Sequence, residues 1–81
     1  MEKNEEIFFS PHANLKVGQR KISRQLVIFT IKNPDFENPS YGLRKEIYRK
    51  WGKNFLKVVI TKKDNLTTVI TAHWVANVKK Q

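Results

Sequence analysis

The chain after Gly42 alternates apolar and polar side chains in three consecutive segments. These segments are LRKEIYRKW, FLKVVITK and LTTVITAHWV, and the turn signals WGKN and KDN separate them. Alternation with a period of two is typical of strands that bury one face. Short turns between such segments join antiparallel neighbours. The second half of the sequence therefore predicts a three-stranded antiparallel meander.

The same alternation assigns each side chain of the meander to one of two faces. The apolar face should carry Leu43, Ile47, Trp51, Leu56, Val58, Ile60, Leu66, Ile70, Ala72 and Trp74. The opposite face should carry Arg44, Glu46, Tyr48, Lys50, Phe55, Lys57, Val59, Thr61, Thr67, Val69, Thr71 and His73. Helices can cover the first face. The second is basic, partly aromatic and rich in hydroxyl groups, so we treat it as the candidate binding face.

The first half of the chain predicts a strand and two helices. Residues 5–9 form a short apolar run that reads as a strand. Ser10 followed by Pro11 is a helix start, because serine caps a free amide and proline dispenses with another. We expect a first helix from Pro11 to about Arg20, weakened by Gly18.

Ser23 is a second helix cap, and the stretch RQLVIFTIKN that follows it ends at a proline. Its β-branched residues suit a strand equally well, but we interpret it as a second helix. The segment NPDFENPSYG contains two Asn-Pro turn signals and a glycine, and we expect it to be a loop between the helical half and the strand half.

These elements define one α+β domain over residues 1–81, with a short N-terminal strand, two helices and a three-stranded meander. We expect both helices to pack on the apolar sheet face, and residues 1–4 and 77–81 to be disordered tails. The chain contains no cysteine, which excludes disulfides and thiolate chemistry. No apolar run approaches the roughly 20 residues that cross a bilayer, and no secretory signal opens the chain, so we expect a cytoplasmic protein without membrane contact.

The charge balance points to polyanionic partners. Sixteen Lys and Arg residues stand against seven Asp and Glu, giving a net charge of +9 and a pI near 10.1. Such a surface binds RNA or DNA by releasing their counterions. A generic cationic surface without a nucleic-acid role is the alternative.

Two histidines give this basic protein a potential for chemistry. RNA is cleaved without a metal when a base removes the 2′-hydroxyl proton, a cation stabilises the phosphate charge and an acid protonates the leaving oxygen. Histidine serves as base or acid near neutral pH. His12 opens the first predicted helix, and Lys16 and Arg20 follow it on the same helical face. His73 lies beside Thr71 on the open face of the last strand.

Each of these features also has a simpler explanation. The stripe of His12, Lys16 and Arg20 fits the solvated side of an amphipathic helix, and a histidine on an exposed strand is often only a surface residue. Tyr48 and Phe55 are able to stack on bases or to pack under the stems of basic residues. The histidines stand without a cluster of Asp, Glu or Cys, so we expect no metal site and no cofactor.

The segments HANLKVGQRKIS, IKNPD and YRKWGKNFLKVVITKKDNLTTVITAHW together resemble a family of small phage-derived proteins of unknown function. The resemblance runs from about Ile7 to Trp74. That family is similar to toxins of the RelE and BrnT type and to barnase-like nucleases, which implies helices packed on one face of an antiparallel sheet and metal-independent RNA cleavage. This chain departs from the family pattern at Lys16, where the family more often has arginine, and at Lys21, which replaces a small residue.

We therefore predict an RNA-binding endoribonuclease of toxin type that forms a 2′,3′-cyclic phosphate. The candidate catalytic residues are His12, Arg20, Thr71 and His73, and the candidate RNA contacts are Lys16, Arg44, Tyr48, Lys50 and Lys57. The expected partners are RNA, in a ribosome-associated setting, and an acidic antitoxin. The alternatives are a non-catalytic nucleic-acid or protein binding module and a structural protein. Whether His12 and His73 share one site stays open, because the strand alternation places His73 on the face opposite the helices.

Overall fold

Two serine caps set the helices of the computed structural model, which describes residues 6–76. Helix α1 spans Pro11–Gln19, and the Ser10 hydroxyl accepts a hydrogen bond from the Ala13 amide at 3.0 Å. Helix α2 spans Arg24–Lys32, and Ser23 accepts from the first amides in the same way. The helical interpretation of the second stretch is confirmed, because the cap and the following Asn-Pro stop outweigh the strand propensity of its β-branched residues.

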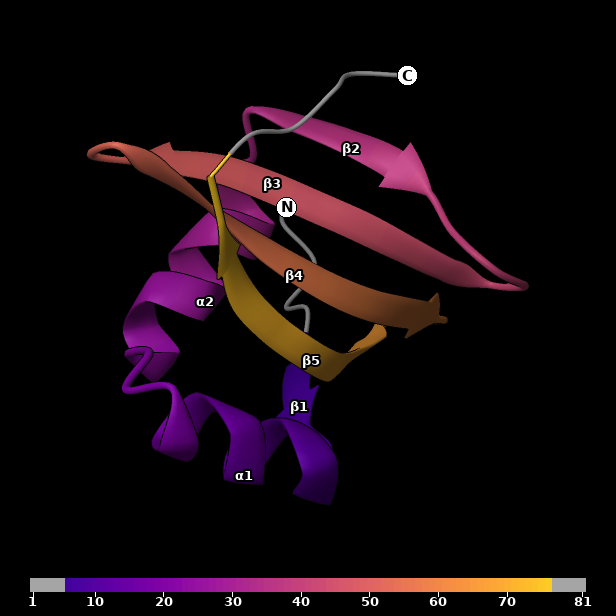
Figure 1. The fold of residues 1–81 in the computed structure, drawn as a ribbon. Coiled ribbons are helices and arrows are strands. Elements are labelled where there is room, and N and C mark those ends of the chain that lie inside the picture. The colour runs from indigo at the N-terminus through magenta and orange to yellow at the C-terminus, as the bar shows by residue number, and fades with distance from the viewer. Residues whose placement is uncertain (1–5, 77–81) are drawn as a thin grey trace.

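The strands form one five-stranded mixed sheet of order β1-β5-β4-β3-β2 (Figure 1). The sheet is built from β1 (Glu6–Phe9), β2 (Phe36–Pro39), β3 (Arg44–Trp51), β4 (Asn54–Lys63) and β5 (Leu66–Val75). Strand β1 runs parallel to β5, whereas the β2/β3, β3/β4 and β4/β5 pairs are antiparallel.

The predicted fold class is therefore wrong in its sheet, which has five strands in place of a separate three-stranded meander. Strand β2 comes from the segment expected to be a loop. It pairs with β3, and the Asp35 carboxylate accepts a hydrogen bond from the Lys50 amide at 2.8 Å. Pro39 is tolerated there because β2 is an edge strand, where a missing amide donor need not break a ladder.

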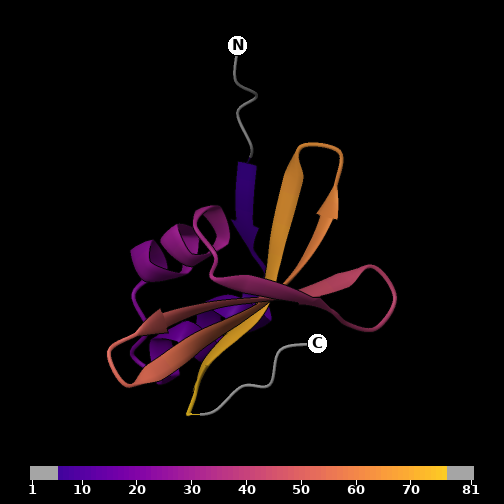
Figure 2. The ribbon, with the colours of Figure 1, turned by 90° about the horizontal axis from the view of Figure 1, so that it is seen from above.

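The expected packing of both helices on one face of that sheet, in the RelE and barnase manner, is not matched either. Strand β1 pairs only with Leu66–Val69 of β5, and the chain then turns at Ser10 into α1. Helix α1 lies beside the part of β5 that β1 leaves unpaired, while α2 lies against β3 and β4. The strong twist of the sheet, seen from above in Figure 2, separates the two positions.

A β-bulge in β5 overturns part of the predicted face assignment. Val59 pairs with Thr71 and Ile60 pairs with Val69, which leaves Ile70 as the extra residue. Because one inserted residue reverses the alternation, Thr67 and Val69 point to the core and are fully buried, although the pattern placed them on the open face. Beyond the bulge, Thr71 and His73 lie opposite Val59 and Lys57 of the open face, as expected.

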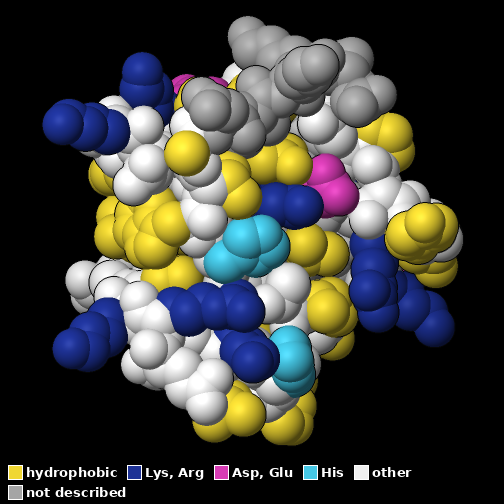
Figure 3. Space-filling view, in the orientation of Figure 1, with side chains coloured by type: hydrophobic (Ala, Val, Ile, Leu, Met, Phe, Trp, Pro, Cys, Tyr) yellow, Lys and Arg dark blue, Asp and Glu magenta, His cyan; other side chains and the backbone are white. Residues whose placement is uncertain are grey.

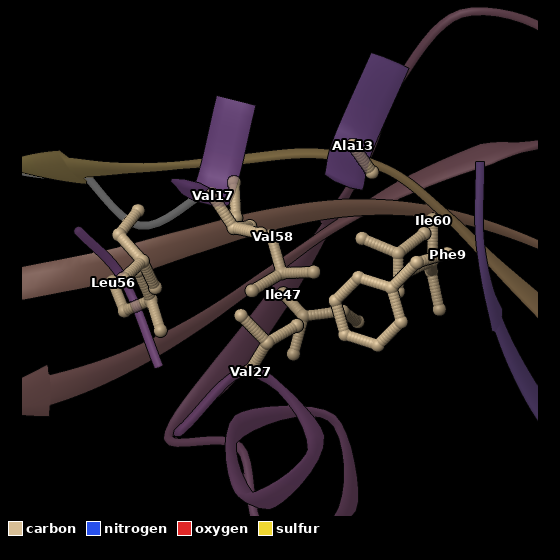
Figure 4. Close-up of a cluster of buried hydrophobic side chains, with 11 residues drawn as sticks. Phe9, Ala13, Val17, Val27, Ile47, Leu56, Val58 and Ile60 are labelled. Atoms are coloured by element: carbon tan, nitrogen blue, oxygen red, sulfur yellow. The ribbon is translucent and has the colours of Figure 1, made fainter. Parts of the chain in front are cut away.

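Three residues expected in the core are exposed. Leu43 precedes β3 and is 82% exposed, and Leu66 and Trp74 lie near the two ends of β5 and are also exposed. The core itself lies between the two helices and the sheet (Figure 4). It is formed by Phe9, Ala13, Val17, Ile22, Val27, Ile47, Leu56, Val58, Ile60, Val69 and Ala72.

Within residues 6–76 no helix is long and apolar enough to cross a membrane. The tails expected to be disordered, residues 1–4 and 77–81, lie outside the described residues.

Candidate functional site

Arg20, the C-cap residue of α1, reaches the unpaired edge of β5. Its guanidinium group donates to the Ala72 carbonyl at 2.8 Å and to the Thr71 hydroxyl at 3.4 Å. Strand β1 ends its pairing at Val69, so without this contact the Ala72 carbonyl would face outward at an open sheet edge. Arg20 therefore fixes the end of α1 against β5 and places its positive charge beside the open face.

A row of side chains crosses the open face from β2 to β5. Phe36 pairs with Tyr48, Tyr48 with Lys57, and Lys57 with His73. Residues directly opposite each other on antiparallel strands have side chains in contact range. The Phe36 and Tyr48 rings stack with their centroids 4.8 Å apart, and the Lys57 ammonium group lies 6.0 Å from the centre of the Tyr48 ring. The row thus leads from aromatic rings to a lysine and then to a histidine.

Glu46 lies next to this row, on β3. Its carboxylate forms an ion pair with Lys57 at 3.7 Å and accepts a hydrogen bond from the Tyr48 hydroxyl at 2.9 Å. Both members of the ion pair are about three-quarters buried, with 23% of each side chain exposed. Lys57 therefore lies between the carboxylate of Glu46 on β3 and the imidazole of His73 on β5.

We call Arg20, Glu46, Lys57, Thr71 and His73 the open-face cluster. Figure 3 shows basic side chains on both sides of the central histidine, with an acidic side chain next to one of them. The five side chains come from α1, β3, β4 and β5, so only the folded sheet brings them together.

Burial and the charges of the cluster shift the pKa values of His73 and of the neighbouring Tyr48. Burial is the main cause that lowers the pKa of His73 below its ordinary 6.5, and the positive charges of Lys57 and Arg20 lower it further, while Glu46 opposes them. Burial, together with the hydrogen bond to Glu46 and its negative charge, raises the pKa of Tyr48 to about 12. His73 is therefore neutral at pH 7 in the unliganded protein, and Tyr48 remains a hydrogen-bond donor.

The predicted site residues do not all belong to this cluster. Arg20, Thr71 and His73 come together, and the expected RNA contact Lys57 joins them. His12 lies eight residues before Arg20, about 12 Å away along the helix axis. Both histidines are on the face seen in Figure 3, with basic side chains between them. His12 therefore lies one helix length from the residue that contacts β5 beside His73.

The other predicted RNA contacts lie in different places. Lys16 is half-buried on α1, between His12 and Arg20 on the same helical stripe. Tyr48 is only 5% exposed and supports Glu46 from below the surface. Arg44, opposite Thr61, and Lys50, opposite Phe55, lie near the two ends of β3 and extend the open face beyond Glu46 and Tyr48.

Glu46 is the residue that sequence reasoning assigned to the correct face without giving it a role. Its signal was the alternation RKEIYRKW, which places Glu46 and Tyr48 on one side of β3. Its ion pair with Lys57 depends on the register between β3 and β4, which the alternation of one strand does not determine.

The arrangement joins the groups that phosphodiester chemistry uses. A carboxylate and an imidazole lie on either side of a lysine, and an arginine and a threonine hydroxyl lie beside the imidazole. Within residues 6–76 no group of three or more His, Asp or Glu side chains is arranged to hold a metal ion. Comparison with known proteins gives no match among family models, curated proteins or solved structures.

Proposed function

We propose that this protein binds RNA on the open face of its sheet and cleaves it at the open-face cluster, without a metal, to leave a 2′,3′-cyclic phosphate. The observation that carries the proposal is the position of Lys57, which is ion-paired with Glu46 and lies opposite His73 in the sheet. A phosphate bound over Lys57 would have a carboxylate on one side and an imidazole on the other. Acid-base cleavage of RNA needs two such groups flanking the phosphate.

In this proposal Glu46 acts as the base that removes the proton from the 2′-hydroxyl. Its carboxylate is held by the Tyr48 hydroxyl and the Lys57 ammonium group, which orient it across the sheet face. The 2′-oxygen then attacks phosphorus, and the bond from phosphorus to the 5′-oxygen of the next nucleotide breaks. Glu46 thereby takes one of the two acid-base roles that the sequence suggested for the histidines.

His73 acts as the acid that protonates the leaving 5′-oxygen. Its pKa is lowered by burial and by Lys57 and Arg20 in the free protein. A bound phosphate is an anion that offsets both positive charges, so substrate binding raises the pKa of His73 and favours the protonated form that the reaction uses. Substrate binding and proton uptake are therefore coupled at this residue.

Lys57, Arg20 and Thr71 stabilise the charge that develops on the phosphate oxygens. Arginine and lysine beside a phosphate act as fixed positive charges, and the threonine hydroxyl adds a hydrogen bond. The Arg20 guanidinium group uses part of its donor set on Ala72 and Thr71, and it carries five donors in all, so donors remain for a phosphate. A cytoplasmic location and an acidic protein inhibitor that covers the basic face belong to the same proposal.

The proposal is tested by incubating the purified protein with a labelled RNA in EDTA and identifying the new 3′ ends. We expect 2′,3′-cyclic phosphate ends with the wild type and losses of about 100-fold or more in kcat/KM for His73→Ala and Glu46→Gln. The matched variants Lys57→Met and Lys63→Met each remove one positive charge from the same face of β4, Lys57 inside the cluster and Lys63 at the end of the strand. Only Lys57→Met should abolish cleavage, because Lys63 lies six residues away, about 20 Å along the strand.

Cleavage that needs an added metal ion, or that survives in both His73→Ala and Glu46→Gln, would contradict the mechanism. Salt-dependent RNA binding without any cleavage favours the alternative of a non-catalytic binding module on the same face.

A further inference from the structure

Of the ion pairs among the described residues, one lies within the open-face cluster and the other two lie on the opposite, helix-covered face of the sheet. Lys45 pairs with Glu37, Arg49 with Asp35 and Lys57 with Glu46, and all these residues lie on β3, β4 or the segment around β2. Of these three paired cations, only Lys57 lies on the open face, where the Glu46 carboxylate partly neutralises it.

The α1 side of the cluster lacks carboxylates. The sequence has no Asp or Glu between Ile7 and Pro34, a stretch that contains both helices. Lys16 and Arg20 form no ion pair with any described residue, and Figure 3 shows basic side chains between the two histidines. An approaching polyanion is therefore attracted along this unneutralised stripe.

The spacing of the stripe suits a chain of phosphates. His12, Lys16 and Arg20 follow each other at intervals of four residues, so successive side chains are about 6 Å apart along the helix axis. A single nucleic-acid strand in an extended form has one phosphate per nucleotide at a comparable interval. Arg20 also donates to β5 beside His73, which makes the stripe continuous with the cluster.

The mechanism proposed above fixes a direction for the strand. The base acts on the nucleotide that keeps the 2′-oxygen, and the acid acts on the 5′-oxygen of the nucleotide that follows. Glu46 on β3 therefore marks the 5′ side of the cleaved bond, and His73 on β5 marks the 3′ side. Beyond β5 the next basic residues are those of α1.

From this continuity, which rests on the proposed function, we propose that the RNA segment 3′ of the cleaved bond lies along α1, with its phosphates bound by Lys16 and His12. The nucleotide on the 5′ side then lies over β3 and β2, next to the half-buried rings of Phe36 and Phe55. Aromatic rings accept bases by stacking, irrespective of sequence. The substrate is therefore a single-stranded RNA that needs phosphates on the 3′ side more than on the 5′ side.

The kinetic test uses DNA oligonucleotides that contain one ribonucleotide, so that only one bond is cleavable, and extends them one nucleotide at a time at either end. We expect the first two added 3′ phosphates each to raise kcat/KM by up to about fivefold, the gain typical of an exposed ion pair. Lys16→Gln and His12→Gln should remove this gain and leave the cleavage of the shortest substrate unchanged. Lys63→Gln, at the far end of β4, should change neither.

A gain that comes only from 5′ extensions, or a Lys16→Gln effect that is equal for short and long substrates, would overturn the inference while leaving the cleavage mechanism intact. Failure of every substrate to be cleaved would instead refute the proposed function. The strand direction is then still tested with a short, uncleavable 2′-fluoro RNA that carries a photoreactive group at its 3′ or its 5′ end. Cross-links from the 3′ end should fall on α1 and those from the 5′ end on β2 and β3, and the reverse pattern refutes the inference.

Discussion

Replacing Arg20 with methionine tests how the end of α1 is held against the sheet. Methionine keeps an unbranched apolar stem and removes the guanidinium group, and with it the 2.8 Å hydrogen bond to the Ala72 carbonyl. A hydrogen bond from a charged donor contributes roughly 1.5 to 3 kcal/mol. The Arg20 side chain is exposed, so water replaces part of this bond, and the 3.4 Å contact with Thr71 adds little.

We therefore expect Arg20→Met to lower the free energy of unfolding by about 1 kcal/mol, which for a domain of this size lowers Tm by roughly 4 to 8 °C. Unfolding can be followed by tryptophan fluorescence, since Trp51 and Trp74 lie on β3 and β5. Lys21→Met is the matched control, because it removes one positive charge from the next, exposed residue and should change stability by no more than about 0.5 kcal/mol.

The same variant should reduce RNA cleavage by about 100-fold or more, because a fixed positive charge beside the phosphate is lost. Equal unfolding temperatures for Arg20→Met and the wild type would refute the edge-anchoring argument. Reduced stability with unchanged RNA binding and cleavage would make Arg20 a structural residue and remove it from the site.

Three further predictions concern the titrating groups of the cluster. Lys57→Met should raise the pKa of His73 towards its ordinary value, as measured by NMR titration, whereas Lys63→Met should leave it unchanged, because Lys57 is one of the charges that lower it. If His73 is the acid, kcat/KM should fall as the pH rises through its lowered pKa, so the pH profile should decline from a point below pH 6.5. A decline that begins above pH 7 would contradict this role. Glu46→Gln should lower the pKa of Tyr48 from about 12 without restoring 10.0, because burial is the larger cause, and tyrosinate absorbance measures this change. In the wild type, the free energy of unfolding should fall between pH 10 and about 12, because only the unfolded chain loses this phenolic proton there, and urea unfolding measures that fall.

The lowered pKa of His73 also makes the stability of the fold depend on pH. Cleavage should decline as the pH rises, whereas stability declines as the pH falls. A histidine whose folded-state pKa is lowered favours the neutral form in the native protein. The unfolded chain binds the proton first as the pH falls below about 6.5, so this residue destabilises the fold under acidic conditions. The protonated state of His73 proposed for cleavage is thus the state that the free protein disfavours. Substrate binding has to supply the free energy that protonates it.

Local signals in the sequence account for the helices and for the open face beyond the bulge. Ser10 with Pro11, and Ser23 with the Asn-Pro stop, define both helices because capping depends on residues that are neighbours in the chain. The alternation in β3 and β4 assigns Glu46, Tyr48 and Lys57 to one face because the strand period is fixed by backbone geometry.

Local signals fail where the fold depends on distant pairing. Strand β1 pairs with a strand about 60 residues later, and no pattern within residues 6–9 specifies that partner. Strand β2 contains two residues, Asn38 and Pro39, that usually break strands, and it forms because β3 supplies a pairing edge. The bulge at Ile70 reverses the face of Thr67 and Val69, since its position is decided by the register with β4 and not by the sequence of β5 alone.

The sequence by itself thus determined the caps, the strand period, the charge of the chain and the presence of His73 and Thr71 on an open strand face. Only the tertiary structure brought Arg20 to the β5 edge and placed Lys57 between Glu46 and His73. The physical reason is that capping and alternation are set over a few neighbouring residues. A site built from one helix and three strands depends on registers and edges that exist only after the chain has folded.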